Sequence, residues 1–206
     1  MIRDPKDLQR YTAAERANHW VTGICFILLM LSGLAFFHPA FYPLTLLFGG
    51  GVWARILHPF IGVILALAFV MMFFRFWRLN VMTRTDVEWL LRIREMIDGN
   101  DHNMPEQGKY NGGQKIVFWG MAVCIPALVC SGLVMWRSYF DFPVGVVRVA
   151  VVVHAAAAIV MIMIAIVHVY AAIWTKNTIR AMWYGTVTRA WAKQHHRAWY
   201  RQMTGR

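Results

Sequence analysis

The 206-residue chain has little charge and very few acidic residues. Only 15% of its residues are charged, against roughly 25% in ordinary soluble domains, and only 10 are Asp or Glu. The hydrophobic content of 59% and the mean hydropathy of +0.46 exclude a disordered chain and a soluble enzyme. The 21 Lys and Arg residues give a net charge of +11, which in a soluble protein would suggest nucleic-acid binding. In so apolar a chain the basic excess has a simpler explanation in membrane topology, and no nucleic-acid partner is expected.

The sequence also lacks the motifs of several common sites. Its three cysteines, Cys25, Cys124 and Cys130, stand inside apolar runs without CxxC or CxxCH spacing. A zinc site and a covalently attached c-type haem are therefore not expected, and structural packing is the expected role of the cysteines. HExxH, P-loop and GxGxxG motifs are absent, as is a nucleophile–base constellation of the hydrolase type.

Four apolar runs are long enough to cross a bilayer, which takes about 20 residues. They predict helices over 19–37, 54–77, 116–136 and 145–174, with a kink at Pro126 in the third. The polar N-terminal stretch and the lack of a small-residue cleavage site predict that the first run stays as a helix. The expected fold is an all-α membrane protein in which residues 1–206 form one domain around a bundle of four transmembrane helices.

The Lys and Arg residues are strongly biased towards one side of these helices. Four precede the first helix, seven lie between the second and third, and seven follow the fourth, whereas the other side has only Arg55, Arg137 and Arg148. The positive-inside rule therefore predicts that both termini are cytoplasmic.

Two cytoplasmic segments carry weaker signals. The basic tail 176–206 contains Trp and Tyr but no acidic residue, and it is expected to lie on anionic lipid headgroups. Thr85 with Glu88 resembles a capping box at the start of a short interfacial helix. Four further histidines are expected to be interfacial or solvated: His38, His102, His195 and His196.

Four histidines lie within the apolar segments, where an ionisable residue is costly and indicates function. His154 and His168 are 14 residues apart, which places them on one helix face about 21 Å apart along the axis. The predicted topology then pairs His58 with His154 in the outer half of the membrane and His19 with His168 in the inner half. Two stacked bis-imidazole sites in a four-helix bundle are what two non-covalent b-type haems require.

The residues one turn beyond these histidines support the same interpretation. They are all small, which would leave room for a flat porphyrin: Gly23, Gly62, Ala158 and Ala172. Small residues also favour close helix approach, and a single intramembrane histidine can bond to a carbonyl. A haem-free transporter or a structural anchor with proton-relaying histidines therefore stays an alternative, although the internal repeats and broken midplane helices of transporters are not evident.

The sequence resembles the cytochrome b (gamma) subunit of respiratory formate dehydrogenase over nearly its whole length. The matching stretches include RYTAAERANHW, ARILHPFIGV, GKYNGGQKIVFW, CSGLVMWR and HVYAAIWTKNTI. The haem-ligand positions of that family fall on His19, His58, His154 and His168. The resemblance implies a membrane anchor and electron conduit in the bacterial inner (cytoplasmic) membrane, not the subunit that oxidises formate.

The resemblance also implies partners and an acceptor. An iron–sulfur (beta) subunit and a molybdenum- or tungsten-containing catalytic (alpha) subunit would lie on the periplasmic face, with electrons passing through the outer haem, then the inner haem, to quinone. The quinone segment of the family maps to Asn111, Gly113 and Gln114, close to His168, and related chains often carry a larger residue at Gly112. Taken alone, Asn111 is better explained as a helix N-cap. The alternative function is the di-haem cytochrome b subunit of a hydrogenase or thiosulfate reductase complex.

Overall fold

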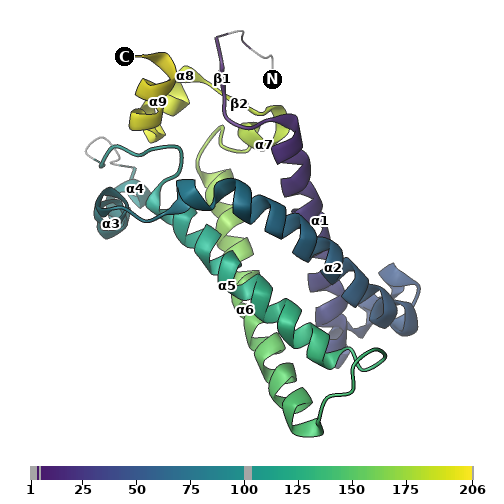
Figure 1. Ribbon diagram of the computed structural model, residues 1–206. Coiled ribbons are helices and arrows are strands. Elements are labelled where there is room, and N and C mark those ends of the chain that lie inside the picture. Colours follow the sequence, from purple (N-terminus) through teal and green to yellow (C-terminus); the bar gives the residue numbers. More distant parts are fainter. Residues whose placement is uncertain (1–3, 5, 100–103, 206) are drawn as a thin grey trace. The chain divides into compact units, whose positions relative to one another are not determined.

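Four long apolar helices dominate the computed structural model, which describes residues 4, 6–99 and 104–205 (Figure 1). They are α1 (Ala13–Phe37), α2 (Gly51–Phe76), α5 (Gly112–Met135) and α6 (Val144–Trp174). All four predicted spans are confirmed as helices long and apolar enough to cross a membrane. Each begins earlier than predicted, and the additional residues of α1 and α5 are mostly small or polar, which a search for apolar runs leaves out.

The apolar side chains of these helices are mostly on the outside. At most 17% of the residues in the most hydrophobic window of each helix are buried within the protein. An exposed apolar surface of this extent needs a hydrocarbon environment. The chain is therefore a multi-pass membrane protein.

The remaining elements are short. Two 3-10 helices, η1 (Pro39–Phe48) and η2 (Trp77–Asn80), lie on either side of α2 in the sequence. The other helices are α3 (Arg84–Leu91), α4 (Ile93–Ile97), α7 (Arg180–Tyr184), α8 (Arg189–His195) and α9 (Arg197–Thr204). Strands β1 (Leu8–Gln9) and β2 (Thr186–Val187) pair antiparallel, with Leu8 opposite Val187.

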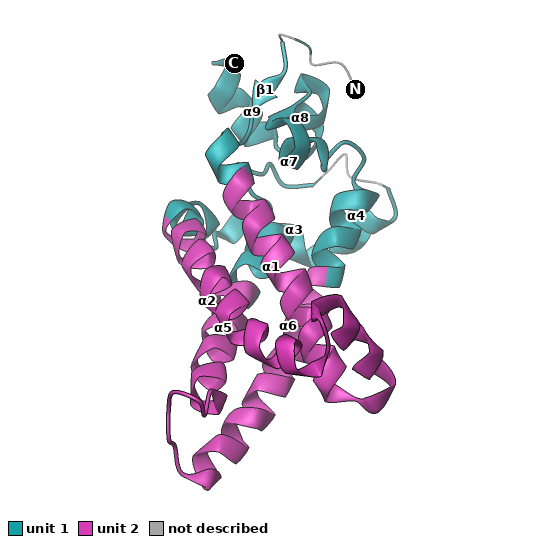
Figure 2. Ribbon diagram, turned by 90° about the vertical axis from the view of Figure 1, so that its right-hand side faces the viewer, with its two compact units in different colours: residues 1–16, 75–120, 166–206 teal, residues 17–74, 121–165 magenta. Residues whose placement is uncertain are grey.

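The chain forms two compact units (Figure 2). Unit 1 contains residues 1–16, 75–120 and 166–206, and unit 2 contains residues 17–74 and 121–165. Every described Lys and Arg of the three basic segments falls in unit 1, whereas Arg55, Arg137 and Arg148 fall in unit 2. The charge bias read from the sequence thus coincides with the division into units.

The core of unit 2 is formed by side chains from all four long helices. Its buried members are Cys25, Leu65, Phe69, Cys124, Ile125 and Met161. The predicted packing role is confirmed for Cys25 and Cys124. It is wrong for Cys130, which is exposed on α5 because its position faces away from the neighbouring helices.

The C-terminal tail folds into the core of unit 1. In this core, Leu8 of β1 packs with buried residues of the tail. These are Ala181, Val187, Trp191, Ala192 and Trp199. The prediction that the tail lies along lipid headgroups is therefore wrong for Trp191 and Trp199, although Trp183 is 60% exposed. The tail finds this partner because β1 pairs with β2, which brings apolar side chains from both ends of the chain together.

The histidines outside the predicted spans do not all behave as expected. His196 is only 1% exposed, so its predicted solvated role is wrong, and His195 is half-buried with its ring 5.5 Å from that of Trp191. His38 caps η1, its Nδ1 accepting a hydrogen bond from the Ala40 amide at 3.2 Å. His102 lies outside the described residues.

The predicted interfacial helix is present as α3, but its cap is two residues earlier than expected. Thr83 Oγ1 accepts a hydrogen bond from the Asp86 amide, and Asp86 Oδ2 accepts one from the Thr83 amide at 2.8 Å. The capping box predicted for Thr85 and Glu88 is therefore wrong. The same spacing of residue types occurs at Thr83 and Asp86, and the Asp86 carboxylate is held there by Lys115 as well.

Candidate metal centre

His58 in α2 and His154 in α6 face each other within unit 2. Their ring centroids are 6.2 Å apart and their planes are inclined by 57°. Both side chains are half-buried among the apolar helices. The structure therefore brings together the two histidines that depth-matching assigned to the outer site.

Each of these imidazoles is held by a serine of a neighbouring helix. Ser32 Oγ in α1 is 2.7 Å from His58 Nδ1, and Ser131 Oγ in α5 is 2.9 Å from His154 Nδ1. Sequence reasoning missed both serines, since they stand 26 and 23 positions before their partners. The available signal was a polar residue inside an otherwise apolar run.

The two imidazoles fit a metal bound between them. Metal–imidazole bonds are about 2 Å long, so two rings on opposite sides of one metal keep their centroids roughly 6 Å apart, close to the 6.2 Å observed. Neutral imidazole is a common haem-iron ligand. One turn beyond His58, a Cβ added to Gly62 would approach, among the described residues, only the Leu29 side chain, at 4.0 Å. The donor set and this lightly filled helix face fit the iron and the flat ring of a haem.

The two histidines predicted for the inner site are each half-buried in a long helix. His19 of α1 belongs to unit 2, and its ring meets that of Trp20 edge-on with centroids 5.9 Å apart. A Cβ added to Gly23, one turn later, would meet no described atom within 4 Å. His168 of α6 belongs to unit 1, so the pairing of His19 with His168 stays a prediction.

Asn111 and Gln114 form a reciprocal cap at the start of α5. The Asn111 amide donates to Gln114 Oε1 at 3.1 Å, and the Gln114 amide donates to Asn111 Oδ1 at 2.9 Å. The N-cap interpretation of Asn111 is thereby confirmed. The quinone-binding role of Asn111, Gly113 and Gln114 stays a prediction.

The glycines after Asn111 allow α5 to begin in close contact with α3. A Cβ added to Gly112 would lie 2.7 Å from the Asp86 carbonyl oxygen, and one added to Gly113 would lie 3.2 Å from the Trp89 ring. The backbone oxygen cannot move aside cheaply. Glycine at position 112 is therefore a requirement of this close approach.

A buried ion pair joins the same two helices. Lys115 Nζ is 2.6 Å from Asp86 Oδ2 and also donates to the Val81 carbonyl at 3.1 Å. Burial alone would raise the pKa of Asp86, but hydrogen bonds from Lys115 and Thr83 outweigh burial and lower the pKa. The carboxylate thus stays ionised and joins α3 to the first turn of α5.

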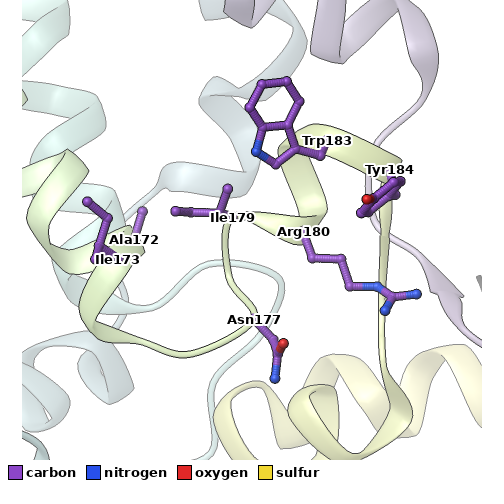
Figure 3. A pocket seen from close by; sticks show the side chains of 7 residues that line it. All are labelled: Ala172, Ile173, Asn177, Ile179, Arg180, Trp183 and Tyr184. Carbon is purple, nitrogen blue, oxygen red and sulfur yellow. The ribbon is translucent and has the colours of Figure 1, made fainter. Parts of the chain in front are cut away.

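A pocket of about 270 Å³ lies at the end of α6 in unit 1 (Figure 3). Its lining residues are Ala172, Ile173, Asn177, Ile179, Arg180, Trp183 and Tyr184. The Arg180 guanidinium points away from Ala172 and Ile173 and pairs with Asp7. Ala172 is one turn beyond His168, but Asn111, Gly113 and Gln114 do not line this pocket.

Comparison with known proteins places this arrangement in a family. The prokaryotic cytochrome b561 family model matches residues 10–185. A formate dehydrogenase cytochrome b556(fdo) subunit of Escherichia coli (strain K12) is 46% identical over 196 residues, 94% of this chain and 92% of the relative. The nitrate-inducible cytochrome b556(Fdn) subunit from the same strain is 44% identical, with 96% and 92% covered. A formate dehydrogenase cytochrome b556 subunit of Haemophilus influenzae is 38% identical, with 94% and 82% covered. A membrane-spanning chain with opposed intramembrane imidazoles, matched over most of its length in this way, belongs to the prokaryotic cytochrome b561 family.

Proposed function

We propose that this chain is the membrane-anchor and electron-transfer subunit of a formate dehydrogenase complex in the bacterial inner membrane, with two non-covalent haems b. The observation that carries the proposal is the opposed pair of imidazoles, His58 and His154, with ring centroids 6.2 Å apart inside an apolar bundle. The names of the relatives, all formate dehydrogenase cytochrome b556 subunits, support the choice of complex.

His58 and His154 would hold the outer haem, and His19 and His168 the inner one. When bound, the two groups supply one-electron transfer between an iron–sulfur subunit outside and a quinone on the cytoplasmic side. The chain itself presents the imidazoles and surrounds them with apolar side chains. Excluding water keeps the sites at low dielectric, where the fixed dipoles around them act more strongly.

The charge distribution supports the proposed orientation. Of the 21 Lys and Arg residues, 18 lie in the three segments that would face the cytoplasm, together with both termini. The opposite connections carry little charge: residues 38–53 have no Lys, Arg, Asp or Glu, and residues 137–148 have Arg137, Asp141 and Arg148. Arg55 follows the first of these connections. These short connections are suited to docking the iron–sulfur (beta) subunit, with the Mo/W catalytic (alpha) subunit beyond it, and not to forming an active site for formate.

Quinone would be reduced beside the loop that precedes α5, with His168 as the neighbouring inner ligand. The cap directs Asn111 Oδ1 at the Gln114 amide, so the Nδ2 group of Asn111 is the remaining donor of that side chain. Such a donor suits a quinone carbonyl. Gly113 lets this end of α5 lie against the Trp89 ring, and protons would be taken up from the cytoplasmic side.

A pyridine haemochrome assay on the intact, assembled complex tests this function. Two haems b per chain are expected, with a reduced-minus-oxidised spectrum typical of b-type cytochromes. The isolated chain should not oxidise formate with an artificial acceptor. One haem or none in the assembled complex, or formate oxidation by the chain alone, would overturn the proposal.

A further inference from the structure

We infer that Ser32 and Ser131 are positioning residues that set the tautomer and the ring orientation of His58 and His154. The inference rests on the proposed function for the identity of the bound group. The hydrogen-bond arrangement itself rests on the geometry of unit 2.

The placement of these serines is unusual for so apolar a chain. The sequence contains only three serines, and two of them are the buried partners of the outer histidines, with Ser32 at 0% and Ser131 at 5% exposure. A hydroxyl is costly in a hydrocarbon environment unless it is hydrogen-bonded. Both hydroxyls meet that condition through one histidine and their own helix.

The direction of the hydrogen bonds follows from counting hydrogens. Ser32 Oγ is 2.8 Å from the Leu28 carbonyl oxygen, and Ser131 Oγ is 2.6 Å from the Ala127 carbonyl oxygen. A carbonyl can only accept, so the single hydroxyl hydrogen of each serine is donated to its own helix. The serine oxygen must then accept from the Nδ1–H of the imidazole.

Both imidazoles are therefore held with their proton on Nδ1. The lone pair of Nε2 is left as the coordinating atom on each ring. A metal-binding histidine commonly donates its other ring N–H to a neighbouring acceptor, which fixes its tautomer and makes the ligand more basic. Ser32 and Ser131 supply that acceptor for the two outer ligands.

The two halves of the site are built from the same local parts. Each serine begins a Ser-Gly-Leu triplet, and the glycine of each triplet lies against the imidazole. A Cβ added to Gly33 would be 3.6 Å from His58 Cε1, and one added to Gly132 would be 3.4 Å from His154 Cε1. The ring thus rests on a small residue while the adjacent hydroxyl holds its Nδ1.

The test uses Ser32→Ala and Ser131→Ala in the complete complex. Each variant should weaken retention of the outer haem by about tenfold. Without the serine acceptor, the imidazole donates less electron density to the iron, so the midpoint potential of the outer haem should rise. The rise should be smaller than about 59 mV, which corresponds to a tenfold ratio for one electron. Redox titration in the visible range, together with the EPR g-values of the oxidised complex, reports both effects. The inner haem should keep its wild-type values.

A matched pair separates the hydrogen bond from any steric effect. Ser32→Thr keeps the hydroxyl, whereas Ser32→Val has nearly the same shape without it, so the first should retain the wild-type potential and the second should resemble Ser32→Ala. Thr22→Ala is the control, because the Thr22 hydroxyl bonds only to the Asn18 carbonyl of its own helix in the described contacts, at 2.9 Å.

Three outcomes can be told apart. A raised potential and weaker retention in the Ala and Val variants, with recovery in the Thr variant, supports the inference. Equal potentials and equal haem retention in Ser32→Thr and Ser32→Val would overturn it. Absence of the outer haem from the wild-type complex would instead defeat the proposed function.

Discussion

Arg10 and His196, 186 positions apart in the chain, meet inside unit 1 with Arg10 Nη2 3.3 Å from His196 Nε2. His196 Nδ1 is 2.7 Å from the Gly108 carbonyl oxygen and must donate to it, so Nε2 accepts from Arg10. The Arg10 guanidinium also lies over aromatic rings, at 4.9 Å from Trp191 and 5.0 Å from Trp199. This contact joins the N-terminal segment, the loop before α5 and the tail, and it requires a neutral histidine.

The stability of unit 1 should therefore depend on pH. Burial lowers the pKa of His196 well below its ordinary value of 6.5, Arg10 and His195 lower it further, and only the bond to Gly108 opposes them. Because the unfolded histidine takes up a proton first, this stabilisation is complete above about pH 6.5 and declines as the pH falls below that value. The protection factors of the amides of residues 191–200, which correct hydrogen exchange for its intrinsic pH dependence, should be lower at pH 5.5 than at pH 7.5.

His196→Gln is the matching control, since glutamine can donate and accept but does not titrate. The difference in protection factors between the two pH values should shrink in this variant. Identical protection factors of the wild-type tail at both pH values would contradict the assignment of a neutral His196.

Single histidine replacements should remove one haem at a time. His154→Ala should remove mainly the outer haem and His19→Ala mainly the inner one, because each haem loses one of its two axial nitrogens. His38→Ala, which removes the cap of η1 and a ring contact with Phe41, should leave both in place. Difference spectra with a haemochrome assay measure the result, and loss of the same component in both variants would contradict the assigned pairs.

Asn111→Asp should separate the helix cap from quinone binding. The carboxylate retains an acceptor for the Gln114 amide but lacks the Nδ2 donor, so α5 should stay capped. Re-oxidation of the haems by quinone should slow by about fivefold to tenfold, as expected for one lost hydrogen bond. Stopped-flow spectroscopy would follow it.

The reduction of the haems by formate through the partner subunits should stay near the wild-type rate in Asn111→Asp. Gly113→Ala is a second variant at the same loop and should also slow re-oxidation. If both variants are re-oxidised at the normal rate, the quinone site lies elsewhere.

Removing Lys115 should destabilise the junction between α3 and α5. Lys115→Met leaves the buried Asp86 carboxylate without its cation, which should cost about 3–5 kcal/mol of unfolding free energy. The double variant Asp86→Asn/Lys115→Met should lose less, because no unpaired charge is left. Thermal unfolding of the wild-type protein and the two variants in detergent gives the comparison, and equal losses in the single and double variants would argue against a coupled pair.

Much of the membrane architecture could be read from the sequence. A run of about 20 apolar residues in a bilayer must form a helix, since its backbone groups have no other partners there. The pairing of His58 with His154 could be predicted from their depths along the two helices, because the predicted direction of each helix places both histidines in the same half of the membrane. The boundaries were less accurate, and Thr83 rather than Thr85 caps α3 because the choice between two similar patterns depends on Lys115 from another helix.

The sequence by itself determined that this is a four-span membrane protein with four histidines inside its apolar helices, because length, hydropathy and charge bias act locally along each helix. Only the tertiary structure decided that Ser32 and Ser131 hold the outer imidazoles and that the tail buries Trp191 instead of lying on lipid. These contacts join residues many positions apart. They depend on which helix faces lie side by side, and no local pattern specifies the partner of a buried polar or aromatic side chain.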